Sequence, residues 1–312
     1  MTIKTNDFFS EWLCDEKLEL SLSTYETHVT YFERHISPFF SQRREYLSDI
    51  TPRDVRDFTN HLKTNGRIDG KGGLSPCSVR KLLALLKQSL NEAVILGYID
   101  KNPASYIKLK KQTTTSQRCV MLSSTDAQKL LDSFKGHYLY PIVLIGLYYG
   151  LRRSEIIGLK WSAIDFNNNT MLINHTVVKC RTIQAKDSTK TNLSTAEYYL
   201  LPDVKEVLLS LKEKSNNSSE YVFTWEDGRR YRPDSVTKTF RNHLVKHGLP
   251  PMRLHDLRHS CASILFDKGY SLEDVKNWLR HSDIETTSNI YLHYNMSRRR
   301  LIIDGLNGTF KL

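Results

Sequence analysis

The residues best suited to catalysis lie between positions 253 and 291. His255 and Arg258 are three residues apart, so on a helix they project from one face and can contact one ligand group. A guanidinium donates two parallel hydrogen bonds to a phosphate, and an imidazole can exchange a proton near neutral pH. Further along, Tyr291 follows ten residues after His281. A tyrosine hydroxyl becomes a nucleophile when a neighbour accepts its proton, so the set predicts phosphoryl chemistry with Tyr291 as the attacking group.

Each of these residues could also be purely structural. A single helical histidine is more often a packing residue than a catalyst, and Tyr291 could be a packing aromatic. A second cluster about a hundred residues upstream, the segment 150–155, favours chemistry. On a helix Glu155 would lie on the same face as Arg152 and could brace its guanidinium; an ordinary surface ion pair is the minor alternative. Arg153 would point about 100° away and is not selected.

Together the two clusters resemble the tyrosine recombinase family, especially the integrases of phages and conjugative transposons. In that family the first catalytic arginine lies in a Gly-Leu-Arg-x-Ser-Glu motif, which residues 150–155 match, and the second lies in His-x-x-Arg-His, which residues 255–259 match. A Leu-Gly-His step then precedes the nucleophile. Here Leu279-Arg280-His281 has arginine where the family has glycine, which puts the family's tight helix end in doubt. The resemblance covers nearly the whole chain, more strongly in its C-terminal half.

The resemblance implies a DNA strand transfer through a 3′-phosphotyrosyl intermediate. Tyr291 would attack a phosphodiester while Arg152 and Arg258 hold the non-bridging oxygens, where charge builds in the transition state. His255 would accept or organise the tyrosine proton, and His281 would support the phosphate. Because the phosphodiester energy stays in the protein–DNA bond, neither ATP nor a metal is expected, and the sequence offers no acidic cluster for two-metal chemistry.

Other roles are assigned with alternatives. In the family a hairpin delivers a lysine to the scissile site, and here the segment 179–195 would form it. Lys190, in a Lys-Thr step seen in many integrases, is the favoured general acid, and Lys186 is the competing choice. Tyr294 is the alternative nucleophile, three residues after the favoured tyrosine. His259 is expected to be a structural hydrogen-bonding residue.

Composition agrees with a nucleic-acid partner. The 312 residues contain 45 Lys and Arg against 34 Asp and Glu, a formal net charge of +11. Such an excess favours a polyanion but does not by itself separate DNA from RNA or anionic lipid. Lipid is the weaker choice because no amphipathic basic helix stands out.

The five cysteines are dispersed without short pairing. This pattern predicts reduced thiols in a cytoplasmic protein rather than disulfides or a zinc site. The N-terminus lacks an apolar signal core, and the most apolar run, residues 138–151, is too short to span a bilayer. It is expected to be a buried helix.

The chain is predicted to be mainly α-helical with a small antiparallel β-sheet. Residues 1–107 would form a helical domain similar to the core-binding domain of the family, with helices over 7–18 and 23–39 and two more after Thr51 and Ser75. Residues 108–120 are basic and lack apolar periodicity, which indicates a linker. Residues 121–312 would form the α+β catalytic domain, with β-rich segments at 170–178 and 196–201.

Several basic side chains are candidate DNA contacts, which would give affinity without sequence information. For each one a solvated surface position explains the residue almost as well. They are Lys81, Lys87, Lys108, Lys110, Lys111, Arg118, Lys238 and Arg241.

The resemblance implies double-stranded DNA at specific recombination sites as the partner, a homo-oligomer on DNA, expected as a tetramer, and an excision or DNA-bending factor. No membrane association is expected. A type IB topoisomerase-like or resolving enzyme would share the cleavage chemistry, and a non-catalytic DNA-binding accessory factor could share the scaffold. Many transposon integrases carry an arm-binding domain before the helical one, and none is visible in this sequence.

Overall fold

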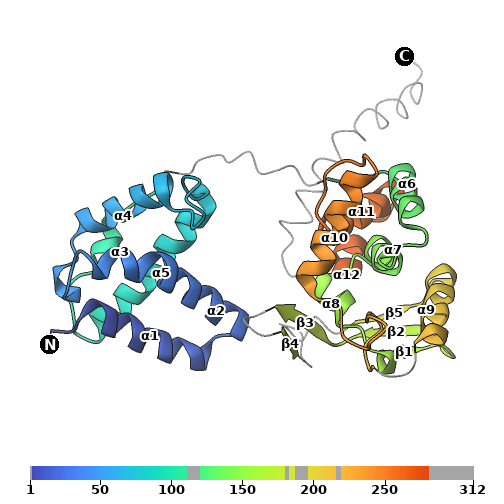
Figure 1. The fold of residues 1–312 in the computed structure, drawn as a ribbon, viewed down its shortest axis with the longest axis horizontal. Helices are drawn as coiled ribbons and strands as arrows, with labels where there is room; N and C mark the ends of the chain where they lie inside the picture. Colours follow the sequence, from blue (N-terminus) through green and yellow to red (C-terminus); the bar gives the residue numbers. More distant parts are fainter. Residues whose placement is uncertain (1, 111–119, 180–182, 187–195, 216–218, 281–312) are drawn as a thin grey trace, which may run out of the picture. The chain divides into compact units, whose positions relative to one another are not determined.

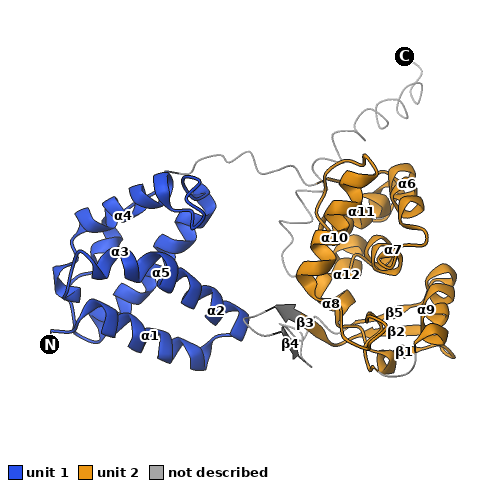
Figure 2. Ribbon diagram, viewed as in Figure 1, with its two compact units in different colours: residues 1–117 blue, residues 118–312 orange. Residues whose placement is uncertain are grey.

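The computed structural model divides the chain into two compact units, residues 1–117 and 118–312 (Figure 2). Each unit has its own hydrophobic core. The boundary between the units falls inside the segment 108–120. The structure describes residues 2–110, 120–179, 183–186, 196–215 and 219–280.

The first unit is built from helices around an aromatic and leucine-rich core (Figure 1). Its longest helix, α5, packs against α1 and α4. The helices are α1 (Thr5–Glu19), α2 (Leu22–Tyr31), a π-helical turn (Phe32–Ile36), α3 (Ser37–Ser41), α4 (Pro52–Asn65) and α5 (Pro76–Ile95), with 3-10 turns at Leu47–Asp49 and Pro103–Tyr106.

Two predicted helix starts are confirmed in this unit. Before α4, the Thr51 hydroxyl accepts a hydrogen bond from the backbone N–H of Asp54 (3.3 Å), and the Asp54 carboxylate accepts one from the Thr51 N–H (2.8 Å). Before α5, the Ser75 hydroxyl accepts from the Ser78 N–H (3.2 Å). A proline occupies the first helical position of both helices, where its missing N–H costs nothing. Each such cap is worth about 1 kcal/mol.

The helix predicted over residues 23–39 is present, but a π-helical turn that was not predicted interrupts its regular hydrogen bonding. The chain passes from α2 into the π-helical turn and then into α3. Pro38 has no N–H to continue the regular hydrogen bonding, which interrupts a helix at this point. The Ser37 N–H bonds instead to the Phe32 carbonyl, five residues back. Phe32 and Ile36 nevertheless stay fully buried, so packing holds the widened turn in place.

The second unit is organised around α7, which contacts α6, α8, α9 and α11. Its residues Ile142 and Val143 are fully buried, as predicted for this apolar run. No helix in the described part of the chain is long and apolar enough to cross a membrane. The helices are α6 (Ser124–Phe134), α7 (Tyr140–Tyr149), α8 (Arg153–Ile157), α9 (Pro202–Lys214), α10 (Pro233–Lys246), α11 (Asp256–Asp267) and α12 (Leu272–Leu279), with a 3-10 turn at Trp161–Ala163.

The strands of this unit form two small antiparallel sheets. One has the order β1-β2-β5 and pairs Met171 with both Ile164 and Tyr198. The other pairs β3 with β4 and sets Val177 opposite Ala185. The strands are β1 (Ile164–Asp165), β2 (Thr170–Ile173), β3 (Thr176–Lys179), β4 (Ile183–Lys186) and β5 (Ala196–Tyr199).

The predicted continuous β-segment 170–178 is therefore split between the two sheets. The break falls at Asn174 and His175, and the His175 imidazole is buried at 3.2 Å from the Tyr221 hydroxyl. After the break, β3 contacts α8 and α10 rather than β5. The contact of His175 with Tyr221 therefore lies at the point where the first sheet ends.

Candidate active site

Three segments of the second unit meet at the buried guanidinium of Arg258, in the first turn of α11. Its side chain is among the largest fully buried ones, with 2% of the residue exposed. Nη1 donates to the Gly150 carbonyl at the end of α7 (2.6 Å), and Nη2 donates to the Leu279 carbonyl at the end of α12. Arg258 therefore ties together the end of α7, 108 residues before it, and the end of α12, 21 residues after it.

Arg152 lies immediately before α8 and is held by Glu155. The Glu155 carboxylate accepts from the backbone N–H of Arg152 and from its Nη1, both at 2.8 Å. The spacing predicted that Arg152 would lie on the same helix face as Glu155, but Arg152 precedes the helix. Its backbone is extended, with φ −69° and ψ 148°, and Glu155 reaches back to the helix start instead. The Glu155 side chain is 2% exposed, whereas that of Arg152 is 38% exposed, so the guanidinium is anchored and still reaches the surface.

The guanidiniums of Arg152 and Arg258 converge. Burial and, to a smaller extent, the charge of Arg152 lower the pKa of Arg258 to about 10. Glu155 opposes this shift and Arg280 adds to it. At neutral pH Arg258 remains protonated, and the cluster carries more positive charge than Glu155 offsets. An anion placed here would gain stabilisation from this excess.

His255 immediately precedes α11. Part of its ring is exposed, but the protein packed around the rest disfavours the imidazolium form, and His259 and Arg258 add to this effect. Together they lower the pKa of His255 to about 4. The imidazole is therefore neutral at pH 7 and free to accept a proton.

His259 lies edge-on to His255, with ring centroids 5.1 Å apart. It was expected to be a structural hydrogen-bonding residue. Its Nδ1 is buried, and no hydrogen-bond partner for that atom is found among the described residues. Burial also lowers the pKa of His259, so this ring is neutral at pH 7 as well.

Arg280 is a site residue that the sequence motif did not assign. It ends α12 in the left-handed conformation, with φ 55° and ψ 48°, so the tight helix end placed in doubt by the missing glycine is present. This conformation costs a non-glycine residue roughly 1–2 kcal/mol. Its Nη2 donates to Glu155 Oε2 at 2.8 Å. The signal for its role was the arginine itself, at a position where the family has glycine.

Other predicted residues of this site lie outside the described residues. They include the expected nucleophile and its alternative. Lys186 is the last residue of β4. The predicted site residues that lie outside the described residues are Lys190, His281, Tyr291 and Tyr294.

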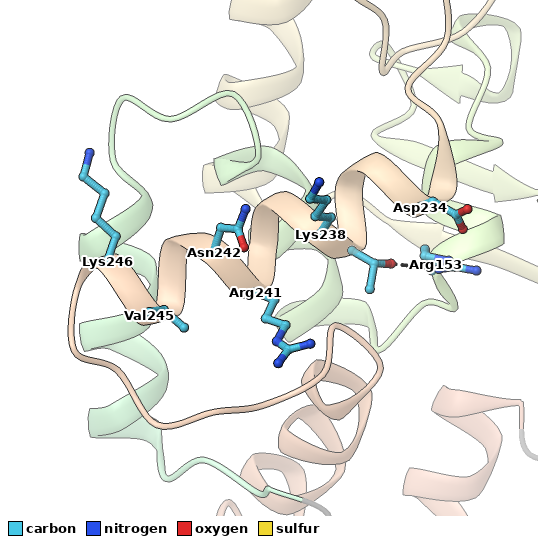
Figure 3. Close-up of a pocket in the computed structure, with 8 residues that line it drawn as sticks. Arg153, Asp234, Lys238, Arg241, Asn242, Val245 and Lys246 are labelled. Carbon is cyan, nitrogen blue, oxygen red and sulfur yellow. Dashed lines mark hydrogen bonds between the residues drawn. The ribbon is translucent and has the colours of Figure 1, made fainter. Parts of the chain in front are cut away.

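Helix α10 carries two of the predicted DNA contacts beside an open cleft of about 710 Å³ (Figure 3). Lys238 and Arg241 are exposed there, and the neighbouring Lys246, not selected from the sequence, lines the same cleft. Arg153 donates to the Thr237 hydroxyl on this helix (2.8 Å), which agrees with its exclusion from the arginine cluster.

The lysines predicted to contact DNA in the first unit have different surroundings. Lys81, Lys108 and Lys110 are exposed. Lys87 is partly buried and its ammonium donates to the Ile107 carbonyl (2.9 Å). The predicted role of Lys87 as a DNA contact is therefore corrected to a structural one. Lys111 and Arg118 lie outside the described residues.

A basic cleft of about 250 Å³ in this unit was not selected from the sequence. It lies where the π-helical turn approaches the end of α4, so its residues come from separate parts of the chain. Its basic lining consists of Arg34, His35, Arg43, His61 and Arg67.

Gly150 is expected to be the least replaceable glycine of the site. It has φ +60°, and an added Cβ would lie 2.2 Å from Leu279 Cδ2 and 3.3 Å from Cys261 Sγ. We expect Gly150→Ala to lower the free energy of unfolding by about 2–5 kcal/mol, the sum of left-handed strain and overpacking. Urea unfolding measures this.

Gly248→Ala is the matched control. Gly248 has φ +62°, and no described atom lies within 4 Å of its Cβ position. We expect Gly248→Ala to lower the free energy of unfolding by only about 1–2 kcal/mol, from backbone strain alone. Equal losses in the two variants would show that Leu279 moves aside freely and that packing at the site is loose.

The fold and the site define a class of protein: a helical unit followed by a mainly helical unit with a small sheet, in which two distant arginines converge beside a histidine. The chain belongs to the phage integrase family. Residues 120–298 match the model of that family, and residues 5–112 match the phage integrase SAM-like domain. The expected class, a tyrosine-type site-specific recombinase with this fold, is confirmed at the level of the family.

Relatives and solved structures agree with this assignment. The chain is 26% identical over 342 residues to a tyrosine recombinase XerC-like protein of Caldanaerobacter subterraneus subsp. tengcongensis, covering 99% of this chain and 84% of that protein. It is 23% identical over 314 residues to the ICEBs1 integrase of Bacillus subtilis, covering 96% and 81%.

Two solved structures share the fold. An integrase of the Tn1549 transposon, in complex with transposon right end DNA, has a TM-score of 0.76 at 18% identity and covers 98% of this chain and 100% of that chain. A lambda integrase dimer bound to a COC′ core site has a TM-score of 0.68 at 18% identity and covers 93% and 77%.

Proposed function

We propose that this protein cleaves and rejoins DNA at specific sites through a 3′-phosphotyrosyl intermediate formed by Tyr291, and so integrates or excises a mobile element. The observation that supports this most is the convergence of Arg152 and Arg258 at one place in the second unit, with Gly150 and Arg258 joined across 108 residues of sequence. Two fixed guanidiniums suit the two non-bridging oxygens of one phosphodiester.

The attack is an in-line displacement at phosphorus. The Tyr291 oxygen forms the new bond to phosphorus while the bond to the 5′ oxygen of the next nucleotide breaks. His255, neutral at pH 7 because of its low pKa, accepts the tyrosine proton. Lys190 protonates the leaving oxygen and His281 supports the phosphate. Reversal of the same steps by a 5′-hydroxyl of another duplex completes strand transfer.

The substrate is double-stranded DNA carrying specific recombination sites, and the reaction takes place in the cytoplasm. The solved relatives were determined with transposon DNA and with a core site, and a lambda integrase was determined as a tetramer bound to a Holliday junction. By analogy we propose that this chain assembles as a tetramer on DNA, with an excision or DNA-bending factor setting direction. Lys238 and Arg241 on α10, with Lys81, Lys108, Lys110, Lys111 and Arg118, would contact the backbone.

A nicked suicide substrate tests the proposal. Duplexes tiled across the DNA that flanks the coding region each carry a nick placed so that the short 5′-hydroxyl strand leaves after cleavage. We expect a covalent protein–DNA adduct on the tile that contains the site, and peptide mass spectrometry should map it to Tyr291. An adduct on another residue would contradict the assignment, and no adduct on any tile would contradict the cleavage proposal.

A second assay separates recombination from the topoisomerase-like alternative. A duplex with a free 5′-hydroxyl is added to the adduct, and a recombinase joins it to the cleaved strand. Relaxation of supercoiled DNA without joining of the second duplex would favour the topoisomerase-like function. A chain that binds DNA without forming an adduct would be an accessory factor.

A further inference from the structure

We propose that Arg280 is a positioning residue of this phosphate site: it fixes the Glu155 carboxylate, and through it the guanidinium of Arg152. The inference rests on the proposed function, because it gives Arg280 an effect on the rate of DNA cleavage. It also makes a prediction about the free protein that needs no DNA.

The hydrogen bonds divide Glu155 between two arginines. Oε2 accepts from Arg280 Nη2 and from the Arg152 backbone N–H, both at 2.8 Å, and Oε1 accepts from Arg152 Nη1 at 2.8 Å. With Oε2 held from two sides, the carboxylate plane is set, and Oε1 presents a fixed acceptor to Arg152. Among the residues that the structure describes, the Arg152 backbone is the one other hydrogen-bond donor to Oε2.

Burial separates the roles of the two guanidiniums. The Arg280 side chain is 6% exposed and that of Glu155 is 2% exposed, whereas 38% of the Arg152 side chain is exposed. Arg152 can therefore contact a phosphate at the surface, and Arg280 is covered by protein. The hydrogen bond of Arg280 Nη2 to Glu155 Oε2, with the Tyr198 ring beside the guanidinium, points to an action of Arg280 through Glu155.

Two backbone carbonyls at the end of α12 contact Arg258 and Arg152. The Leu279 carbonyl accepts from Arg258, and the Arg280 carbonyl lies 3.5 Å from Arg152 Nη2. A glycine at position 280 could provide these carbonyls with less strain. Only a long cationic side chain also provides the partner of Glu155, and the Arg280 guanidinium lies 5.6 Å from the Tyr198 ring centre, which confines it further.

The first test compares Arg280→Gly with the native chain. Glycine suits the left-handed backbone and removes the whole Arg280 side chain, both the guanidinium and its aliphatic stem. On the suicide substrate at saturating protein, we expect the single-turnover cleavage rate to fall roughly 10–100-fold, since small misplacements of a positioned group cost this much. DNA affinity should stay within about twofold, because Arg152 and Arg258 keep their charge.

Two further measurements separate positioning from a general structural role. Added guanidinium, which fits the vacated space, should restore part of the rate in Arg280→Gly, and Arg280→Lys should retain more activity than Arg280→Gly. Arg229→Gly, which removes an exposed arginine paired with Asp227 (side chain 82% exposed), should leave the rate unchanged. A native rate in Arg280→Gly, or an equal loss in rate and affinity, would overturn the proposal.

A double-mutant cycle tests the same coupling without DNA. Arg152→Gln and Arg280→Gly are combined and the unfolding equilibrium is measured in urea. We expect non-additivity of at least about twofold in the equilibrium constant, which disappears in a Glu155→Gln background. Additive effects would overturn the inference even if cleavage proceeds. If the native chain forms no adduct but the cycle shows coupling, the proposed function fails while the positioning of Arg152 by Arg280 stands.

Discussion

Replacing Tyr291 by phenylalanine is expected to abolish the covalent protein–DNA adduct. Removal of the phenolic oxygen leaves no atom to form the bond to phosphorus, so the loss should be complete on the scale of the assay. The arginine cluster is unchanged by this substitution, and DNA affinity should therefore stay within about twofold, because binding comes from charge contacts that remain. Adduct on denaturing gels and binding by mobility shift are measured on the same suicide duplex.

Tyr294→Phe is the matched control for this prediction. It makes the same chemical change three residues further on and should retain adduct formation. Loss of the adduct in Tyr294→Phe with retention in Tyr291→Phe would reverse the assignment of the nucleophile. Loss in both variants with normal binding would mean that one tyrosine acts indirectly, and mass spectrometry of the native adduct identifies which.

Arg258→Lys is expected to slow cleavage by roughly 10²–10³-fold, the usual consequence of losing one donor aimed at a developing oxyanion. Lysine keeps a positive charge but cannot reproduce the planar fork that contacts the Gly150 and Leu279 carbonyls. At least one buried carbonyl loses its donor. The free energy of unfolding should therefore also fall, by about 1–3 kcal/mol.

The measurements are single-turnover cleavage and urea unfolding, each compared with Arg229→Lys. Arg229 is exposed, so its replacement should change stability by less than about 0.5 kcal/mol. A rate for Arg258→Lys within a few-fold of the native rate would show that charge alone suffices and that the fork geometry is not used. A loss of stability with an unchanged rate would make Arg258 a structural residue only.

The two variants test different parts of the proposal. Tyr291→Phe removes the bond-forming atom, whereas Arg258→Lys removes transition-state stabilisation and leaves that atom in place. A native chain that forms adducts, together with these two losses, would support phosphotyrosyl chemistry. Joining of a second duplex would then distinguish recombination from relaxation.

Local signals in the sequence were sufficient for much of the fold. The caps at Thr51 and Ser75 and the apolar run of α7 depend on neighbours a few residues away, so their patterns survive in the tertiary structure. The prediction over residues 23–39 missed the π-helical turn because apolar spacing does not reveal how Pro38 shifts the hydrogen bonds around it.

The sequence by itself determined the family, through two short motifs whose residue types and order are specific, and it singled out Arg152 and Arg258. It did not determine how these arginines are held. The Arg152 backbone is held locally by Glu155, three residues further on, but the place of Arg280 beside Glu155 arises from a contact across 125 residues. The packing of α7, α11 and α12 brings the side chains of the arginine cluster together. Hydrogen bonds between distant segments depend on the whole fold, and the periodic sequence patterns that predict helices and strands do not indicate them.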